Sequence, residues 1–383
     1  MTSHKILTRE FFFSFFAQFT LSSSFFILLT TLPIYLSKLG AKESEIGILM
    51  GIFALSSLLL RPMIGRALLR NPETRFMMIG SILFAFASFA YILSKPFWPF
   101  LIVRIFQGTG WALFATSVFT LVTRISPETH RGQSLGYFYL AINMAFALAP
   151  SLGIFLMLHT NFTFLFLVSG GLSLCSLCFS IRLDKTQKPF MANLSGGPSS
   201  FIHRKALPIG LMAFMGSFIW GAVTTFFPLY ALSHGISNPG LFFGAVAMTL
   251  IVSRSLGGRI FDLYPRDRVI FPCIVAHILA MVILSFSTTL PLFLVVAVIW
   301  GLGIAFFYPT LVAYTIDLAG ESRGPAVGTY LAFSDFGGSV GAVVMGSILQ
   351  RTSYRTMFLC TALVGLINLI YFYTAILKRP KQG

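Results

Sequence analysis

The chain has 383 residues, of which 56% are hydrophobic and only 10% are charged, and its mean hydropathy is +0.85. A soluble domain carries about a quarter charged residues, so this composition excludes an ordinary soluble protein and predicts membrane-spanning helices. The net charge of +16 does not indicate a nucleic-acid-binding protein, because the basic residues lie between apolar runs and form no basic stripe on a soluble module.

Twelve apolar runs, each long enough to cross a bilayer as a helix, follow one another along the chain. The first is too long for the apolar core of a signal peptide, so we interpret it as a retained span. We predict an all-α integral membrane fold with an N-terminal six-helix bundle (1–182), a cytoplasmic linker (183–205) and a C-terminal six-helix bundle (206–383). The predicted spans lie near residues 11–36, 45–68, 76–94, 97–123, 133–158, 162–182, 206–233, 239–261, 269–287, 291–317, 325–349 and 353–377.

The lysines and arginines predict the orientation of the chain. If the N-terminus lies in the cytoplasm, 21 of the 27 basic residues fall on the cytoplasmic side, 5 fall outside, and Arg104 lies within a span. Cytoplasmic loops carry an excess of basic residues. We therefore predict a multi-pass protein of the cytoplasmic (inner) membrane with both termini in the cytoplasm.

The two halves of the sequence repeat each other. The segment RPMIGRALL (61–69) returns as RSLGGRIFD (254–262), and GTGWALF (108–114) returns as GLGIAFF (301–307), both at an offset of 193 residues. A duplicated six-helix unit places a substrate site between the halves, near the middle of the membrane. The matched residues in the first pair of segments are Arg61 with Arg254, Gly65 with Gly258, and Arg66 with Arg259.

Three motifs resemble those of the major facilitator superfamily. After the second span, GRALLRNPETR (65–75) resembles the family's loop signature G-x-x-x-D-R-x-G-R. In the fourth span, RIFQGTGWA (104–112) resembles R-x-x-Q-G-x-G-x-A. In the fifth, AFALAPSLG (145–153) resembles the antiporter motif G-x-x-x-G-P-x-x-G, with alanine at both glycine positions before Pro150. The resemblance implies a twelve-span fold of two pseudo-symmetric bundles. Within the family, the chain is similar to the proton-driven drug and sugar efflux branch.

The loop signature departs from the family at one position. Leu69 replaces its aspartate, so the family's cytoplasmic lock cannot be transferred to that residue, whereas Asp262 is present in the second half. We expect Asp262 to meet the start of the fifth span near Arg131, and Arg66 or Arg70 to reach Asp317 or Glu321; the alternative is a set of solvated charges that only determine topology. The predicted gate residues are Arg61, Gly65, Arg66, Arg70, Arg131, Arg254, Gly258, Arg259 and Asp262.

Asp335 is the acidic residue placed deepest in a predicted span. It lies about ten residues into the eleventh span, which is roughly 15 Å, or half of the hydrocarbon core. An intramembrane ionisable group is a functional hypothesis by default, so we predict that Asp335 binds a proton; the alternative is a protonated aspartate that only packs helices. Its counterpart in the repeat, Asn143, cannot titrate and is a candidate for substrate contact or coupling.

Arg104 and Gln107 form a second polar pair within a span. Their spacing of three residues places both on one face of a helix, and a charge in a membrane is costly. We predict that the pair looks into the protein, where Arg104 either binds a polar or anionic part of the substrate or tunes a proton site. Snorkelling of Arg104 to the surface is the alternative. The second half has Ala297 and Trp300 at these positions.

Small residues at four-residue spacing recur in the second, fifth, eighth and eleventh spans, where they allow helices to approach closely. They include Gly47 and Gly51 and the pair Gly337 and Gly341. They suit a seam between two bodies that rock against each other, and ordinary static packing explains them equally well. The helix-5 motif contributes Ala149, Pro150 and Gly153, and span membership alone makes Trp220 and Tyr308 candidates for lining a cavity.

Together these features predict a secondary transporter that works by alternating access and exports a small amphiphilic molecule, such as a drug, sugar or metabolite, in exchange for protons. The alternatives are proton-coupled uptake of a metabolite and, more remotely, an intramembrane enzyme or a non-transporting sensor. We expect no enzyme activity, because intramembrane chemistry needs a converging cluster of His, Cys, Asp or Glu and Asp335 stands nearly alone. We expect no metal, because the four cysteines lie in apolar runs without a completed ligand set, and no cofactor. The expected partners are a small-molecule substrate and the lipid bilayer, without nucleic acid, and the expected state is a monomer.

Overall fold

The computed structural model describes residues 8–127, 131–183, 203–257, 264–319 and 323–377, with backbone only at 131–132, 205, 254–257 and 323–325. Twelve α-helices and no strand lie in this part of the chain, one helix in each predicted span, which confirms the predicted all-α fold. The helices are α1 (Arg9–Lys38), α2 (Glu43–Ala67), α3 (Glu73–Ala90), α4 (Trp98–Ile125), α5 (Arg131–His159), α6 (Phe162–Ile181), α7 (Leu207–Ser233), α8 (Gly240–Gly257), α10 (Arg266–Phe286), α11 (Leu290–Ala319), α12 (Arg323–Leu349) and α13 (Tyr354–Tyr371).

Most of the helices are long and apolar enough to cross a membrane. Eleven of those in the described residues meet that criterion, and α8 contributes a shorter apolar helix over Gly240–Ser253. Side-chain caps start several of them: Thr8 accepts from the Phe11 amide at 3.2 Å, and Asn161 accepts from the Phe164 amide at 2.8 Å. Such caps satisfy amides that the first turn of a helix leaves without partners. The eleven apolar helices make this a multi-pass membrane protein.

The chain forms two units, residues 1–39 with 52–195, and residues 40–51 with 196–383. The first part of α2 belongs to the second unit because it packs closely on α12. Ser339 donates to the carbonyl of Gly51 at 2.7 Å, and a Cβ on Gly51 would lie only 2.8 Å from the Ser339 carbonyl. Glycine at this position is thus what permits the approach.

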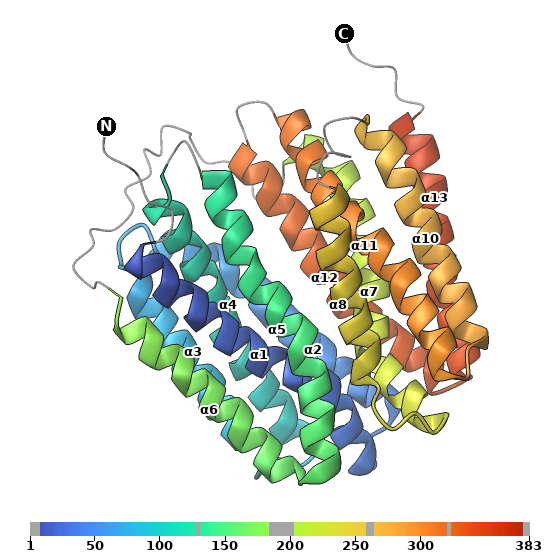
Figure 1. Ribbon diagram of the computed structural model, residues 1–383, viewed down its shortest axis with the longest axis horizontal. Coiled ribbons are helices and arrows are strands. Elements are labelled where there is room, and N and C mark those ends of the chain that lie inside the picture. Colours follow the sequence, from blue (N-terminus) through green and yellow to red (C-terminus); the bar gives the residue numbers. More distant parts are fainter. Residues whose placement is uncertain (1–7, 128–130, 184–202, 258–263, 320–322, 378–383) are drawn as a thin grey trace. The chain divides into compact units, whose positions relative to one another are not determined.

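Equivalent helices pack in the same way within each unit. In the first, α1 contacts α5 and α6, and α3 contacts α4 and α6; in the second, α7 contacts α12 and α13, and α10 contacts α11 and α13. The blue-to-green ribbons of α1, α3 and α6 lie side by side in Figure 1. The repeat seen in the sequence is therefore also a repeat of helix contacts.

The repeated glycines of α4 and α11 meet equivalent neighbours. Gly108 lies against the Phe53 carbonyl of α2, and a Cβ on Gly110 would lie 2.8 Å from the carbonyl of Gly80 on α3. In the second unit, a Cβ on Gly301 would lie 2.9 Å from Thr249 of α8, and one on Gly303 would lie 3.0 Å from the His277 ring of α10. The glycines of α4 thus allow close contact with α2 and α3, and those of α11 allow close contact with the equivalent helices α8 and α10.

The glycines of α12 serve static packing within the second unit. A Cβ on Gly337 would overlap the Phe214 carbonyl of α7, and one on Gly341 would overlap that of Phe218. Both glycines therefore face α7 of their own unit.

Candidate functional site

A buried polar cluster joins α4 to the end of α3. The Arg104 guanidinium donates from Nη1 to Oε1 of Gln107 at 2.7 Å, and the Tyr91 hydroxyl donates to the same oxygen at 2.6 Å. Arg104 is 2% exposed, and Gln107 and Tyr91 are fully buried. The i, i+3 spacing on one helix brings Arg104 and Gln107 together, whereas Tyr91 comes from another helix.

The aromatic ring of Phe53 completes the surroundings of Arg104. The guanidinium carbon lies 4.8 Å from the ring centroid, which is cation–π geometry. The charged group therefore lies inside the first unit and does not snorkel to the surface. Burying a charge is costly unless other groups compensate, and the amide oxygen of Gln107 with the face of Phe53 provides part of that compensation.

The second unit carries an alanine, Ala297, and one aromatic residue, Trp300, where the first carries this polar pair. Trp300, at the position equivalent to Gln107, is fully buried and stacks on Trp220 with ring centroids 5.3 Å apart. It also stacks on Phe242 at 5.9 Å. Within the described residues, Nε2 of Gln107 and Nε1 of Trp300 both lack a hydrogen-bond partner. Equivalent positions of the repeat thus each keep one buried N–H donor available.

Asp335 lies near the middle of α12, one residue after a serine that joins a chain of hydroxyl groups. Asp335 is half-buried on α12, next in sequence to Ser334, whose hydroxyl lies 2.7 Å from that of Ser217 on α7. Ser217 in turn donates to the hydroxyl of Tyr308 on α11 at 3.4 Å. A carboxyl group within a membrane span can bind and release a proton. Asn143, its counterpart, is half-buried on α5.

The predicted gate residues are only partly within the described chain. Arg61 is half-buried near the end of α2, while Gly65, Arg66 and Arg70 are exposed. Arg131 begins α5 and Arg254 lies in α8, without a described side chain. The proposed contact of Asp262 with Arg131, and the residues Gly258, Arg259 and Glu321, lie outside the described residues.

Two ion pairs, one in each unit, were not predicted from the sequence. Asp317, which we expected only as a possible partner of Arg66 or Arg70, pairs with Arg266 of α10 at 3.4 Å, and both side chains are partly exposed. Glu73, fully buried at the start of α3, pairs with Arg124 at the end of α4 at 3.0 Å. The signal for the second pair was present: the two residues lie at adjacent ends of consecutive antiparallel spans, on one predicted side of the membrane.

The helix-5 motif packs within the first unit. Ala149 and Pro150 are buried, and a Cβ on Gly153 would lie 3.2 Å from the Ile27 side chain of α1. The motif thus shapes the α1–α5 contact. Its small side chains allow the helices to approach without a polar group.

A cluster of buried serines, also missed, ties α1 to α3 and α6. The Ser24 hydroxyl lies 2.6 Å from that of Ser169 and accepts from Ser173 at 3.0 Å, and Ser88 lies 3.2 Å from Ser169. Interhelical hydrogen bonds of this kind hold membrane helices together. The spacing of serines in the sixth span (169, 173, 176 and 180) was the available signal.

The described residues contain no group of three His, Cys, Asp or Glu side chains that could hold a metal ion. Each unit has its own polar candidate: the buried pair of Arg104 and Gln107 in the first unit, and Asp335 in the second.

Comparisons with known proteins agree with this architecture. Residues 14–288 and 239–383 match the profile of the Major Facilitator Superfamily. The chain is 26% identical to the staphylopine export protein of Staphylococcus aureus over 92% of each chain, and 23% identical to the quinolone resistance protein NorA of the same species over 90% of this chain and 91% of that one.

Solved structures share the fold at low sequence identity. A point mutant of the nucleoside transporter NupG superposes with a TM-score of 0.83 and 13% identity, covering 96% of this chain and all of that one. A POT family transporter in complex with a thioalcohol-conjugated peptide gives a TM-score of 0.81 and 11% identity, with 96% of each chain covered.

Proposed function

Because the chain belongs to the major facilitator superfamily, and is a membrane transporter rather than an enzyme, we propose that it exports a small amphiphilic molecule in exchange for protons. The substrate class is a drug, sugar or metabolite. Transport proceeds by alternating access, with the proton gradient as the energy source.

The main support for the proposal is the similarity of this chain to exporters along nearly its whole length. The staphylopine exporter and NorA each align over about nine-tenths of both chains. An alignment of this length includes most of both units, so the direction of transport is a property that relatives of this kind can share. The solved nucleoside transporter and POT family transporter share the fold alone, because their identity to this chain is 13% and 11%.

Asp335 is the proposed proton-binding residue. Its half-buried place near the middle of α12 supports this role. A carboxyl group near the membrane middle changes charge when it binds a proton, and the free energy of that change can bias one conformation over another.

Arg104 and Gln107 are the proposed substrate or coupling residues. Their burial supports a role inside the protein. Nε2 of Gln107 is a buried donor without a hydrogen-bond partner in the described residues, which a polar group of the substrate would reach only when alternating access opens this cluster. The half-buried ring of Trp220, stacked on the buried ring of Trp300, supplies an apolar surface of the kind that amphiphilic molecules favour. Asn143 and Tyr308 remain candidates for polar contacts.

The proposal extends to placement in the cell. We propose the cytoplasmic membrane, a monomer, and both termini in the cytoplasm, as the distribution of basic residues predicts. Cysteine labelling of Gln350→Cys, between α12 and α13, with a membrane-impermeant reagent on intact cells tests the orientation: labelling supports it, and protection of that site contradicts it.

The decisive experiment uses the purified protein in liposomes that enclose a pH-sensitive dye. A quinolone antibiotic and a panel of sugars and metabolites are added outside, without an initial pH gradient. Exchange for protons makes the interior more alkaline as solute enters, whereas uptake with protons makes it more acidic. Alkalinisation that depends on one solute supports the proposal; acidification favours the symport alternative, and solute entry without any pH change contradicts proton coupling.

A further inference from the structure

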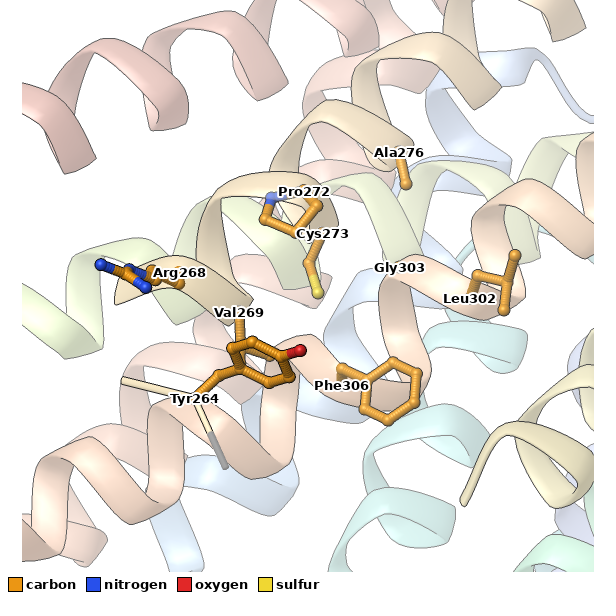
Figure 2. Close-up of a pocket in the computed structure, with 9 residues that line it drawn as sticks. All are labelled: Tyr264, Arg268, Val269, Pro272, Cys273, Ala276, Leu302, Gly303 and Phe306. Atoms are coloured by element: carbon orange, nitrogen blue, oxygen red, sulfur yellow. The ribbon is translucent and has the colours of Figure 1, made fainter. Parts of the chain in front are cut away.

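A groove of about 440 Å³ runs between α10 and α11 in the second unit. Figure 2 shows Tyr264, Cys273 and Phe306 around one space, with Arg268 at one end and Leu302 at the other. Most of the lining is apolar: Val269, Pro272, Cys273, Ala276, Leu302 and Phe306. None of these residues belongs to the two polar candidates described above.

The depth of the groove matches half a bilayer. Arg268 is two residues from the start of α10, and Ala276 lies eight residues further along the helix. At 1.5 Å per residue this is about 12 Å, close to the roughly 15 Å thickness of one leaflet's hydrocarbon. The groove therefore extends from the end of the span toward the middle of the membrane.

The groove opens on a surface that lipid covers. Pro272 and Leu302 line it and are exposed, and the neighbouring Phe271 and Val298 are also exposed on α10 and α11. Exposed apolar side chains along a membrane span face lipid tails. Small residues keep the groove open, because larger side chains at Ala276 or Gly303 would fill it, and a Cβ on Gly303 would already meet Cys273 and His277.

The end of the groove at the start of α10 carries a positive charge. Arg268 and Tyr264 are exposed there, whereas the nearby Arg266 is paired with Asp317 at 3.4 Å. Within the described residues no ion pair involves Arg268. A guanidinium and a phenol at the head of an apolar channel complement a phosphate group joined to an acyl chain.

We propose that this groove binds one anionic phospholipid of the surrounding leaflet. Its phosphate lies against Arg268 and Tyr264, and one acyl chain lies along α10 and α11 as far as Ala276. Because α11 also carries Trp300 and Tyr308, a lipid here contacts the helix that supplies two of the candidate site residues.

Native mass spectrometry of the protein released from nanodiscs tests this inference. The nanodiscs contain equal amounts of phosphatidylglycerol and phosphatidylcholine, and the bound lipids are counted. We expect one retained phosphatidylglycerol and about fivefold weaker retention in Arg268→Gln, the effect of one basic residue at an anionic lipid surface. Equal retention of the two lipids by the unmodified protein overturns the proposal.

Two further variants make the result specific. Arg351→Gln removes an exposed arginine outside the groove and should leave retention unchanged. Ala276→Phe fills the deep end but keeps Arg268, and we expect it to release the phosphatidylglycerol. If Ala276→Phe retains the lipid, the lipid is held by surface charge alone and the groove is not its site.

Discussion

Nη1 of Arg104 lies 2.7 Å from Oε1 of Gln107, and both side chains are buried in the first unit. The same oxygen accepts from Tyr91 at 2.6 Å. One amide oxygen therefore serves two donors, one of them charged, in a place from which water is excluded.

Replacing that oxygen should destabilise the protein. Gln107→Met preserves the size of the side chain but removes the acceptor, so each of two buried donors loses a partner at a cost of about 1–3 kcal/mol. The expected result is a lower midpoint of thermal unfolding in detergent. Gln350→Met, at an exposed glutamine, is the matched control and should leave the midpoint unchanged.

The double variant Arg104→Met/Gln107→Met should be less destabilised than the sum of its single variants. Removing both members of a buried polar pair leaves fewer groups without partners than removing one. The unfolding midpoints of the two single variants and the double variant measure this coupling. Strict additivity would show that the Arg104–Gln107 contact contributes nothing to stability.

Breaking the Glu73–Arg124 pair should cost more than breaking the Arg266–Asp317 pair. Glu73 is fully buried and the Arg124 side chain is only 17% exposed, whereas those of Arg266 and Asp317 are 32% and 54% exposed. We expect Glu73→Ala to lower the unfolding free energy by about 3 kcal/mol, because it leaves a largely buried charge. Asp317→Ala should cost less than about 1 kcal/mol. Equal shifts in chemical unfolding would contradict this difference in burial.

Adding one methyl group to α12 should disturb its contact with α7. The Cβ of Gly341→Ala would overlap the carbonyl of Phe218, and a backbone cannot move aside as a flexible side chain does. We expect overpacking to cost about 1–3 kcal/mol. Gly171→Ala on α6 is the control, since no atom lies within 4 Å of its added Cβ, and alanine there should be neutral or stabilising. The unfolding midpoints of the two variants should therefore shift in opposite directions or by clearly different amounts.

Neutralising Asp335 should separate proton coupling from solute binding. Asp335→Asn preserves the shape of the side chain but cannot bind and release a proton, so we expect loss of transport driven by a pH gradient and retention of solute exchange at equal pH. Asp267→Asn, at the first turn of α10, is the control and should transport normally. Gradient-driven transport by Asp335→Asn at the normal rate would show that Asp335 does not couple protons.

The sequence alone determined the helices and their number. Runs of about 20 apolar residues have one stable form in a bilayer, because every backbone group must be hydrogen-bonded within the span. The internal repeat also indicated two pseudo-symmetric bundles. The repeated glycines agree with it, because a glycine allows a neighbouring helix to approach closely in either unit. They are Gly108, Gly110, Gly301 and Gly303. The spacing of Arg104 and Gln107 predicted that they share one helix face, because helical periodicity depends only on separation along the sequence.

Only the tertiary structure decided which partners these residues meet. Tyr91 and Phe53 lie 13 and 51 residues before Arg104 in the sequence, and no periodicity relates them to it. The pairing of Glu73 with Arg124, the serine cluster of α1, α3 and α6, and the groove of α10 and α11 likewise depend on the rotation of one helix against another. That rotation results from the packing of all the side chains at once, and so it appears in the folded unit and not in any single span.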